Sequence, residues 1–285
     1  MPASTSPAPP TSRTGTDGSS RPTPADASRS VPVKRTALGR FNHSSAAASE
    51  TRDGRVVVYS GDDQDGGYLY KFVGAAPWKS ERARGRSPLD HGVLFVARFQ
   101  EDGTGQWPAL THGRGALTTA LGWKDQADIL LRAREAADAL GATRLDRPQQ
   151  IAVSPGNGDV YCALANSAGG HTRAVGPRDA NPHGHIVRWQ EGPDTGAGFH
   201  WDVFLPAGDP AHDKGIALGE AGRLASPKGL AFGSAGQLWG STGIAADALH
   251  REDRHHENLG NNALLAADPR TGEVRRLAGG VIGAA

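Results

Sequence analysis

Short apolar runs alternate with turns along most of this sequence. In the clearest copy, apolar residues 151–153 and 160–164 flank a Pro-Gly-Asn-Gly-Asp turn at 155–159. Residues 230–239 and 263–277 repeat this arrangement, each with a turn rich in Gly, Ser or Asp at its centre. Apolar runs of this length that are bounded by turn residues predict β-hairpins.

The same hairpin pattern also occurs earlier, at residues 56–73 and 93–103. Recurrence of one hairpin along a chain is typical of a β-propeller, in which each blade is a small antiparallel sheet. We therefore predict an all-β fold, a β-propeller, with one inserted α-helix. A β-sandwich is the alternative, but it does not require hairpins that are so alike.

The helix is predicted at residues 125–140, where the apolar side chains are three and four positions apart. Gly141 follows as a C-terminal stop signal. We expect this amphipathic helix to lie between two blades and to pack on the sheets through its apolar stripe. The stripe consists of Ile129, Leu130, Ala133, Ala136, Ala137 and Leu140.

The first 32 residues differ in composition from the rest of the chain. They are rich in Ser, Thr, Pro, Ala and Gly and contain almost no large apolar side chains, so burial cannot offset the entropy lost on ordering. We predict a disordered tail at residues 1–32 and a folded domain at residues 33–285. We find no membrane-spanning segment and no secretory signal, so the expected location is cytoplasmic.

The charge balance narrows the range of partners. The chain has 31 Lys and Arg residues and 30 acidic residues, for a formal net charge of +1. Such a balance gives no electrostatic reason to expect binding to nucleic acid or to a membrane surface. Cys162 is the single cysteine, which excludes an internal disulfide, and its apolar surroundings predict a buried, inert thiol.

Three residues are the first candidates for chemistry. Asp62 and Asp63 lie in an acidic turn whose oxygens can bind a metal ion, although the turn does not match the helix-loop-helix calcium pattern. Arg147 precedes Pro148, which restricts its backbone. A guanidinium held at the start of a strand can offer two parallel donors to a phosphate. A surface ion pair is the alternative for Arg147.

Several histidines are weaker candidates. His183 and His185 directly precede an apolar run, where they either line a cleft or belong to a turn. His250, His255 and His256 lie in a charged segment, and this context favours a solvated loop over a metal site.

Taken in order, several motifs resemble those of the PhoX-type alkaline phosphatases. They lie at residues 38–43, 58–63, 70–73, 94–99, 136–141, 146–148, 181–182, 184–189 and 260–262. The resemblance implies a six-bladed propeller that holds calcium and iron ions and hydrolyses phosphate monoesters. It also implies that Arg147 is the catalytic and substrate-binding residue that contacts the phosphate.

The sequence departs from the family at positions that matter for metal binding. Ser44 and Gln149 stand where the family usually has glutamate, and Lys228 stands where it usually has aspartate. Because hard cations need anionic oxygens, we expect weakened metal binding, or none, and impaired catalysis. The resemblance covers the C-terminal half of the family, so we expect an incomplete propeller that another polypeptide could complete.

Three functions follow as hypotheses. The first is a phosphatase with weak or no activity, acting on a phosphate ester. The second is a non-catalytic propeller fragment or binding module. The third, a calcium-dependent lactonase-like propeller, rests on analogy of fold alone and requires a carboxylate cluster that the sequence does not reveal.

Overall fold

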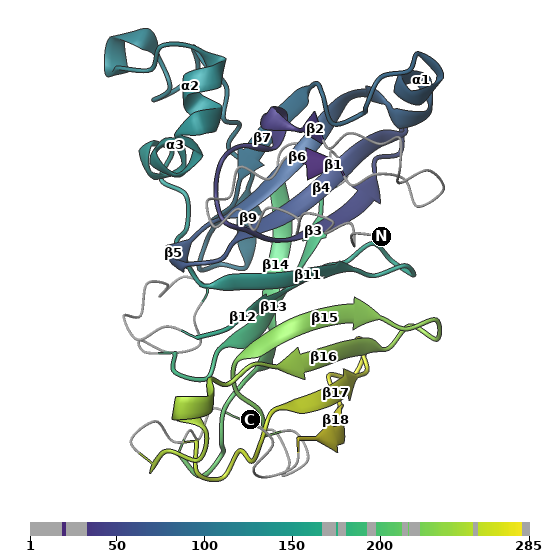
Figure 1. The fold of residues 1–285 in the computed structure, drawn as a ribbon, viewed down its shortest axis with the longest axis vertical. Helices are drawn as coiled ribbons and strands as arrows, with labels where there is room; N and C mark the ends of the chain where they lie inside the picture. Colours follow the sequence, from purple (N-terminus) through teal and green to yellow (C-terminus); the bar gives the residue numbers. More distant parts are fainter. Residues whose placement is uncertain are drawn as a thin grey trace, which may run out of the picture.

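Three antiparallel sheets follow one another along the long axis of the molecule (Figure 1). The computed structural model describes residues 19–20, 33–166, 175, 181–192, 198–212, 216, 223–252 and 256–280. Strands dominate these residues and helices are few, so the fold is mostly β, as the hairpin pattern predicts. The sheets do not close into a ring within the described part of the chain, and the propeller stays a prediction.

The first sheet is built from residues 43–96. Its strands, in spatial order, are β3 (His43–Glu50), β4 (Arg55–Asp62), β6 (Leu69–Pro77) and β7 (Gly92–Val96). Side chains alternate between its two faces, so Val57 and Tyr59 point to one side and Val58 to the other. The apolar runs predict β4, β6 and β7. They miss β3, which is made mainly of Ser and Ala.

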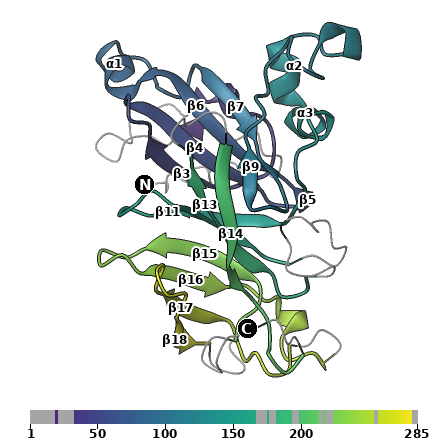
Figure 2. The same ribbon diagram turned by 180° about the vertical axis from the view of Figure 1, so that it is seen from behind.

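The second sheet contains the clearest predicted hairpin. Its strands, in spatial order, are β11 (Pro148–Val153), β12 (Val160–Leu164), β13 (His185–Glu191), β14 (Gly198–Pro206), β9 (Thr104–Gln106) and β8 (Arg98–Phe99). The apolar run at 93–99 therefore crosses from the first sheet into the second, with a break at Ala97. Figure 2 shows β9 beside the long strand β14, which it pairs with.

The third sheet confirms the two remaining predicted hairpins. Its strands are β15 (Pro227–Phe232), β16 (Leu238–Thr242), β17 (Ala263–Ala267) and β18 (Val274–Gly279), paired in sequence order. Two small strand pairs complete the architecture. They are β1 (Ser19–Ser20) with β2 (Val33–Lys34), and β5 (Asp65–Gly67) with β10 (Leu145–Asp146).

The predicted tail lies mostly outside the described residues. Only Ser19 and Ser20 of this segment are described, and they pair with Lys34 and Val33 respectively. Residues 1–18 and 21–32 lie outside the described part of the chain, so the disorder predicted there is not tested.

The predicted helix at 125–140 is divided into two short helices. These are α2 (Gln126–Leu131) and α3 (Ala133–Ala139), and they meet at Arg132, whose φ of −108° and ψ of 38° are not helical. Asp125 caps α2, since its side chain accepts a hydrogen bond from the Asp128 backbone nitrogen at 2.8 Å. Gly141 follows α3 with a φ of +65°, as the stop signal predicts.

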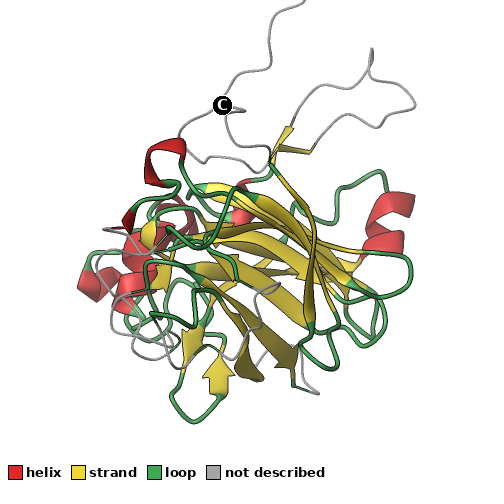
Figure 3. Cartoon of the chain, turned by 90° about the horizontal axis from the view of Figure 1, so that it is seen from below, coloured by secondary structure: helices red, strands yellow, loops and turns green. Residues whose placement is uncertain are grey.

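The apolar stripe of these two helices packs on the outer face of the first sheet. Ile129, Ala133 and Ala136 are fully buried there in the cluster that contains Tyr70 and Leu94. A further short helix, α1 (Trp78–Ala83), follows β6 and has no signal in the apolar pattern. From below (Figure 3), the strands lie at the centre of the molecule and the helices towards its edges.

Apolar side chains fill both spaces between the three sheets. Tyr59 of the first sheet packs in one cluster with Trp189 of the second, with ring centroids 5.5 Å apart. Tyr161 of the second sheet packs on Phe232 of the third at 5.4 Å. Cys162 is fully buried, and burial raises the pKa of its thiol to about 12, in agreement with the predicted inert thiol. This packing brings the first strands of the three sheets, β3, β11 and β15, side by side.

A buried ion pair connects the first sheet to the second. Lys71 of β6, fully buried, donates a hydrogen bond from Nζ to Glu191 Oε2 of β13 at 2.8 Å. Glu191 Oε1 also accepts a hydrogen bond from the Tyr59 hydroxyl at 2.9 Å, and Lys71 Nζ lies 4.5 Å from the centre of the Trp107 ring. Burial lowers the pKa of Lys71 to about 8, against the opposing effect of Glu191.

This pair makes the stability depend on pH. The folded-state pKa of Lys71 lies below its ordinary value of 10.5, so the unfolded chain binds more protons between about pH 8 and that value. The contribution of Lys71 to the free energy of unfolding is therefore expected to rise with pH through this window. Buried Cys162 acts in the opposite direction above about pH 9, so the measurement is the difference in urea-unfolding free energy between the unaltered chain and the double variant Lys71→Met/Glu191→Leu, and this difference should rise with pH across the window.

Removing one partner should cost more than removing both. Glu191→Ala leaves the Lys71 ammonium buried without its anion, so we expect a loss of about 3–5 kcal/mol. The double variant should lose less than the single variant, with a remaining loss of about 1–3 kcal/mol because the buried Tyr59 hydroxyl no longer has its acceptor. As a control, Glu273→Ala removes the exposed partner of Arg275 and should cost less than about 1 kcal/mol. Equal losses in the single and double variants would show that the unpaired ammonium is not the source of the loss.

Candidate functional site

The candidate site lies where the first strands of the three sheets begin. The second residue of each of these strands is one of the substituted positions: Ser44 in β3, Gln149 in β11 and Lys228 in β15. The Ser44 hydroxyl oxygen lies 2.9 Å from the Pro148 carbonyl oxygen and 3.0 Å from the Gln149 carbonyl oxygen, so it joins β3 to β11. The structure thus brings two of the three substituted positions, Ser44 and Gln149, directly together.

The residues that precede β11 and β15 share an unusual backbone conformation. Arg147 has a φ of 52° and Ser226 a φ of 51°, and each is followed by proline. A non-glycine residue in the left-handed region is uncommon, and such strain costs on the order of 1–3 kcal/mol. Arg147 therefore lies directly before β11, as the sequence predicts, and its backbone is left-handed.

Asp62, the last residue of β4, is fully buried beside two partners. The Asn42 backbone nitrogen donates to Asp62 Oδ1 at 3.1 Å, and Arg134 of α3 places Nε 3.0 Å from Asp62 Oδ2. Burial raises the pKa of Asp62, while the Arg134 charge acts in the opposite direction. The Asp62 carboxyl is thus already matched by a positive charge from within the chain.

Asp63 connects the acidic turn to Arg147. Asp63 Oδ1 lies 3.6 Å from Arg147 Nη2 and accepts a hydrogen bond from the Gln149 amide nitrogen. The Asp63 backbone nitrogen donates to the Asn42 carbonyl at 2.8 Å, which fixes the turn. The structure therefore brings Asp62, Asp63, Arg147 and Gln149 into one neighbourhood.

These residues do not form the ligand set that the resemblance implies. Calcium and iron need several converging anionic side chains, or soft ligands. Among the described residues, no group of three His, Cys, Asp or Glu side chains is arranged to hold a metal ion. Ser44 uses its hydroxyl on backbone carbonyls and Gln149 directs its amide nitrogen at Asp63. The described side chains therefore do not fit a calcium or iron centre.

Lys228 and the histidines take other positions. Lys228 is exposed at the second residue of β15, with its aliphatic part against Gly243. His183 and His185 are buried, so they do not line an open cleft. His256 is also buried rather than solvated, whereas His255 lies outside the described residues. Sequence patterns also do not identify Arg134 as the partner of Asp62, because the two residues are 72 positions apart and Arg134 lies on a helix.

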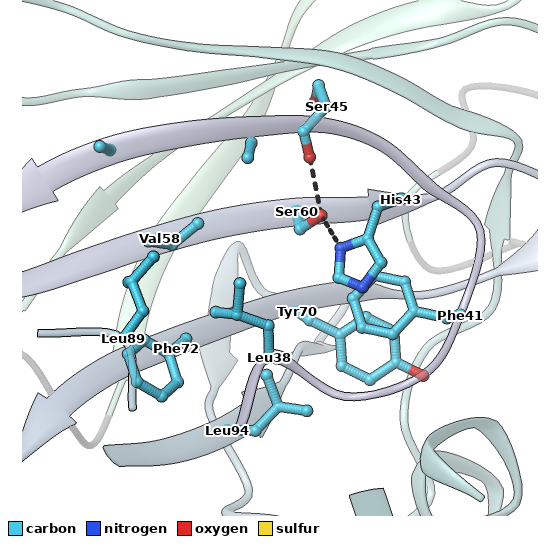
Figure 4. Close-up of a pocket in the computed structure, with 12 residues that line it drawn as sticks. Leu38, Phe41, His43, Ser45, Val58, Ser60, Tyr70, Phe72, Leu89 and Leu94 are labelled. Carbon is cyan, nitrogen blue, oxygen red and sulfur yellow. Dashed lines mark hydrogen bonds between the residues drawn. The ribbon is translucent and has the colours of Figure 1, made fainter. Parts of the chain in front are cut away.

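A separate apolar pocket of about 380 Å³ lies on the outer face of the first sheet. Figure 4 shows Val58, Phe72 and Leu94 along this pocket and His43 at one end. His43 Nδ1 lies 2.8 Å from the Ser60 hydroxyl oxygen, and the Ser60 hydroxyl donates to the Ser45 carbonyl at 2.7 Å. This pocket shares the strand β3 with the candidate site but contains none of its charged residues.

Comparison with known proteins identifies the family. A family model described as alkaline phosphatase PhoX matches residues 23–284, and so begins inside the predicted tail. The chain belongs to the PhoX family of alkaline phosphatases. No curated protein matches the sequence. The search for spanning helices, applied to the described residues, finds none long and apolar enough to cross a membrane.

Among solved structures, this PhoX-family chain resembles the PhoX of Pseudomonas fluorescens in complex with vanadate, a transition state analogue. The two share 42% identity with a TM-score of 0.80, over 90% of this chain and 47% of the other. This chain thus spans about half the length of that relative. A protein of unknown function from Dyadobacter fermentans DSM 18053 matches at 12% identity, over 86% of this chain and 56% of the other, with a TM-score of 0.31.

The contact between Asp62 and Arg134 predicts a pH-dependent effect of mutation. Arg134→Gln removes the charge that opposes the raised pKa of Asp62. The buried carboxyl then ionises without a partner in alkaline buffer but can stay protonated in acid. We expect the variant to lose more stability at about pH 8 than at about pH 5. Urea unfolding at both pH values measures the difference.

Arg275→Gln is the matched control for this measurement, since Arg275 is exposed and pairs only with an exposed glutamate among the described residues. It should change stability little, and by nearly the same amount at both pH values. A loss in Arg134→Gln that is independent of pH would show that Arg134 acts through packing rather than through the Asp62 charge.

Proposed function

We propose that this chain binds phosphate monoesters at the start of β11, with Arg147 as the phosphate contact, and hydrolyses them weakly or not at all. Membership of a phosphatase family supports a phosphate ester as the ligand. The similar PhoX from Pseudomonas fluorescens was solved with vanadate, a transition state analogue. Vanadate and phosphate are both oxyanions that an arginine can bind through two parallel N–H groups.

The environment of Arg147 supports its role as the phosphate contact. Its side chain is 47% exposed, so the guanidinium can reach a ligand from solvent. Its nearest carboxylate oxygen, on Asp63, is 3.6 Å away, which is longer than a strong hydrogen bond. A phosphate can therefore compete for the guanidinium donors. The strained backbone fixes the direction in which the side chain leaves the strand.

One observation carries the proposal of weak or absent hydrolysis: the second residues of β3, β11 and β15 carry no negative charge, whereas the resemblance implies carboxylates there. Ser44 donates to backbone carbonyls, Gln149 donates to Asp63, and Lys228 adds a positive charge. Hydrolysis of a phosphate monoester needs an activated water as well as neutralised charge. The described residues offer positive charge for binding, but no group of three His, Cys, Asp or Glu side chains placed to hold a metal ion that could activate a water.

Calcium and iron remain properties of the family in this proposal. When bound, such ions neutralise phosphate charge and supply or orient a nucleophile. The described side chains of this chain do not fit them, so we assign no step to a metal. The lactonase-like alternative needs a similar carboxylate cluster and gains no support. Completion of the sheets by another polypeptide stays a prediction from the resemblance.

Binding and turnover can be tested separately on the purified chain. We expect calorimetry to detect inorganic phosphate binding, and Arg147→Gln to weaken the affinity tenfold or more because one bidentate charged contact is lost. The control Arg275→Gln should leave the affinity unchanged. Hydrolysis of p-nitrophenyl phosphate should stay at or near the rate without protein.

Two results would contradict this proposal. Absence of phosphate binding would remove the ligand that the proposal names. Robust turnover, together with calcium or iron retained in stoichiometric amount by metal analysis, would refute impaired hydrolysis. The triple variant Ser44→Glu/Gln149→Glu/Lys228→Asp restores the family's charges, and any gain in bound metal would identify those three positions as the cause of the loss.

A further inference from the structure

A buried polar network lies immediately before β13, and the proposed function does not use it. Asn181, which is fully buried, is its centre. Asn181 Nδ2 donates to Asp146 Oδ2 at 3.0 Å and lies 2.7 Å from His185 Nδ1. Because an amide nitrogen only donates, His185 Nδ1 is the acceptor. Asn181 Oδ1 in turn accepts a hydrogen bond from the Gly184 backbone nitrogen at 3.1 Å.

This network lies next to two residues that adjoin Arg147, namely Asp146 and Ala165. Asp146 directly precedes Arg147 and is itself 1% exposed. The Arg147 carbonyl accepts a hydrogen bond from the Ala165 backbone nitrogen at 3.3 Å. Gly184, which Asn181 holds at a φ of +79°, approaches the backbone of residues 164–165 so closely that a β-carbon would lie 2.1 Å from the Ala165 carbonyl oxygen. Asn181 therefore binds Asp146 directly, and it also holds Gly184, which lies against the residue that hydrogen-bonds the Arg147 carbonyl.

The same segment also reaches the second strained residue. The Ser226 backbone nitrogen donates to the His183 carbonyl at 2.6 Å. Arg147 and Ser226, the two left-handed residues that precede the prolines of β11 and β15, are thus tied to one short buried segment, residues 181–185. A strained backbone persists only where its surroundings hold it in place, and this segment supplies contacts to both.

Asp146 depends on Asn181 in particular. Among the described residues, Asp146 Oδ1 accepts no hydrogen bond, and Asp146 Oδ2 accepts one from the Asn181 amide. Within this part of the chain, the Asp146 carboxyl therefore depends on Asn181 for its side-chain hydrogen bond. A buried carboxylate that loses its donor moves towards other donors or water, since an unmet buried charge is costly. Any such movement displaces Arg147, because the two residues are adjacent in the chain.

We infer that Asn181 is a positioning residue for phosphate binding: through Asp146 and Gly184 it holds Arg147 in the strained conformation that directs the guanidinium to the ligand. This inference rests on the proposed function, because it names the residue that orients the proposed phosphate contact. Asn181 itself does not touch the ligand. Its loss should change phosphate affinity through Arg147 and through no other group.

The first experiment is a double-mutant cycle with inorganic phosphate as the probe. We expect Asn181→Ala to raise the dissociation constant about tenfold. In an Arg147→Gln background the same change should have little further effect, since the two residues act as one unit. Asn258→Ala is the matched control: Asn258 Nδ2 donates to the fully buried Asp209 at 2.9 Å, in a pair that the described contacts do not connect to Arg147.

The second experiment uses a variant of nearly the same shape, which keeps the test decisive should Asn181→Ala fail to fold. Asp146→Asn removes a negative charge next to the anion site. Electrostatics alone would then strengthen phosphate binding. Positioning predicts the reverse, because the charged acceptor that holds the Asn181 amide is lost, and we expect affinity to fall severalfold.

The outcomes separate the inference from the proposed function. Three results would each overturn the inference while leaving phosphate binding by Arg147 intact. The first is an unchanged phosphate affinity in Asn181→Ala. The others are an effect of Asn181→Ala that is equally large in the Arg147→Gln background, and tighter phosphate binding in Asp146→Asn. Absence of phosphate binding by the unaltered chain would overturn both. Weakened binding in both single variants, with strong coupling to Arg147 and no effect of Asn258→Ala, would support the inference.

Discussion

Buried negative charge needs a partner, and this requirement shapes the region where the first strands of the three sheets begin. In this chain the buried carboxyl of Asp62 is matched by Arg134 from α3. The Asp146 carboxyl relies on the amide of Asn181. Side chains of the chain itself thus meet part of the demand of these buried carboxyls, although Asp146 Oδ1 accepts no hydrogen bond among the described residues.

The packing of the sheets determines where these charged side chains lie relative to one another. Aromatic and aliphatic side chains fill the spaces between the sheets, so neither β3 nor β15 can shift relative to β11 without opening a cavity in a close-packed layer. The Lys71–Glu191 pair adds a directional contact between the first two sheets. Because the sheets are held in this way, small polar contacts such as those of Ser44 can join β3 to β11 at a defined position.

Sequence patterns predict the strands well and the site only in part. Apolar runs bounded by turns identify β4, β11, β12 and the strands of the third sheet, because a buried strand must carry apolar side chains. They miss β3, whose small residues lack such a pattern. They also predict one helix where Arg132 separates two, since spacing of side chains does not record a local change of ψ.

Arg147, Asp62 and Asp63 can be selected from residue type and neighbours in the sequence. Their partners cannot. Arg134 and Asn181 lie on other elements, and their roles depend on distances that only the folded chain defines. Likewise, the resemblance identifies positions 44, 149 and 228 as altered, but only the structure shows that Ser44 and Gln149 direct their donors into the chain.

The comparison of Arg147 with Ser226 separates what the backbone and the side chain each contribute to the proposed phosphate contact. Both residues precede a proline at the start of a first strand, and their φ values agree within a degree. The left-handed turn therefore precedes the first strand of the second and third sheets, and is not confined to one site. Only at Arg147 does this turn carry a long cationic side chain next to an acidic residue. The proposed phosphate contact therefore depends on the residue that occupies the strained turn: the Arg147 guanidinium is charged and half exposed, whereas the small neutral side chain of Ser226 is buried.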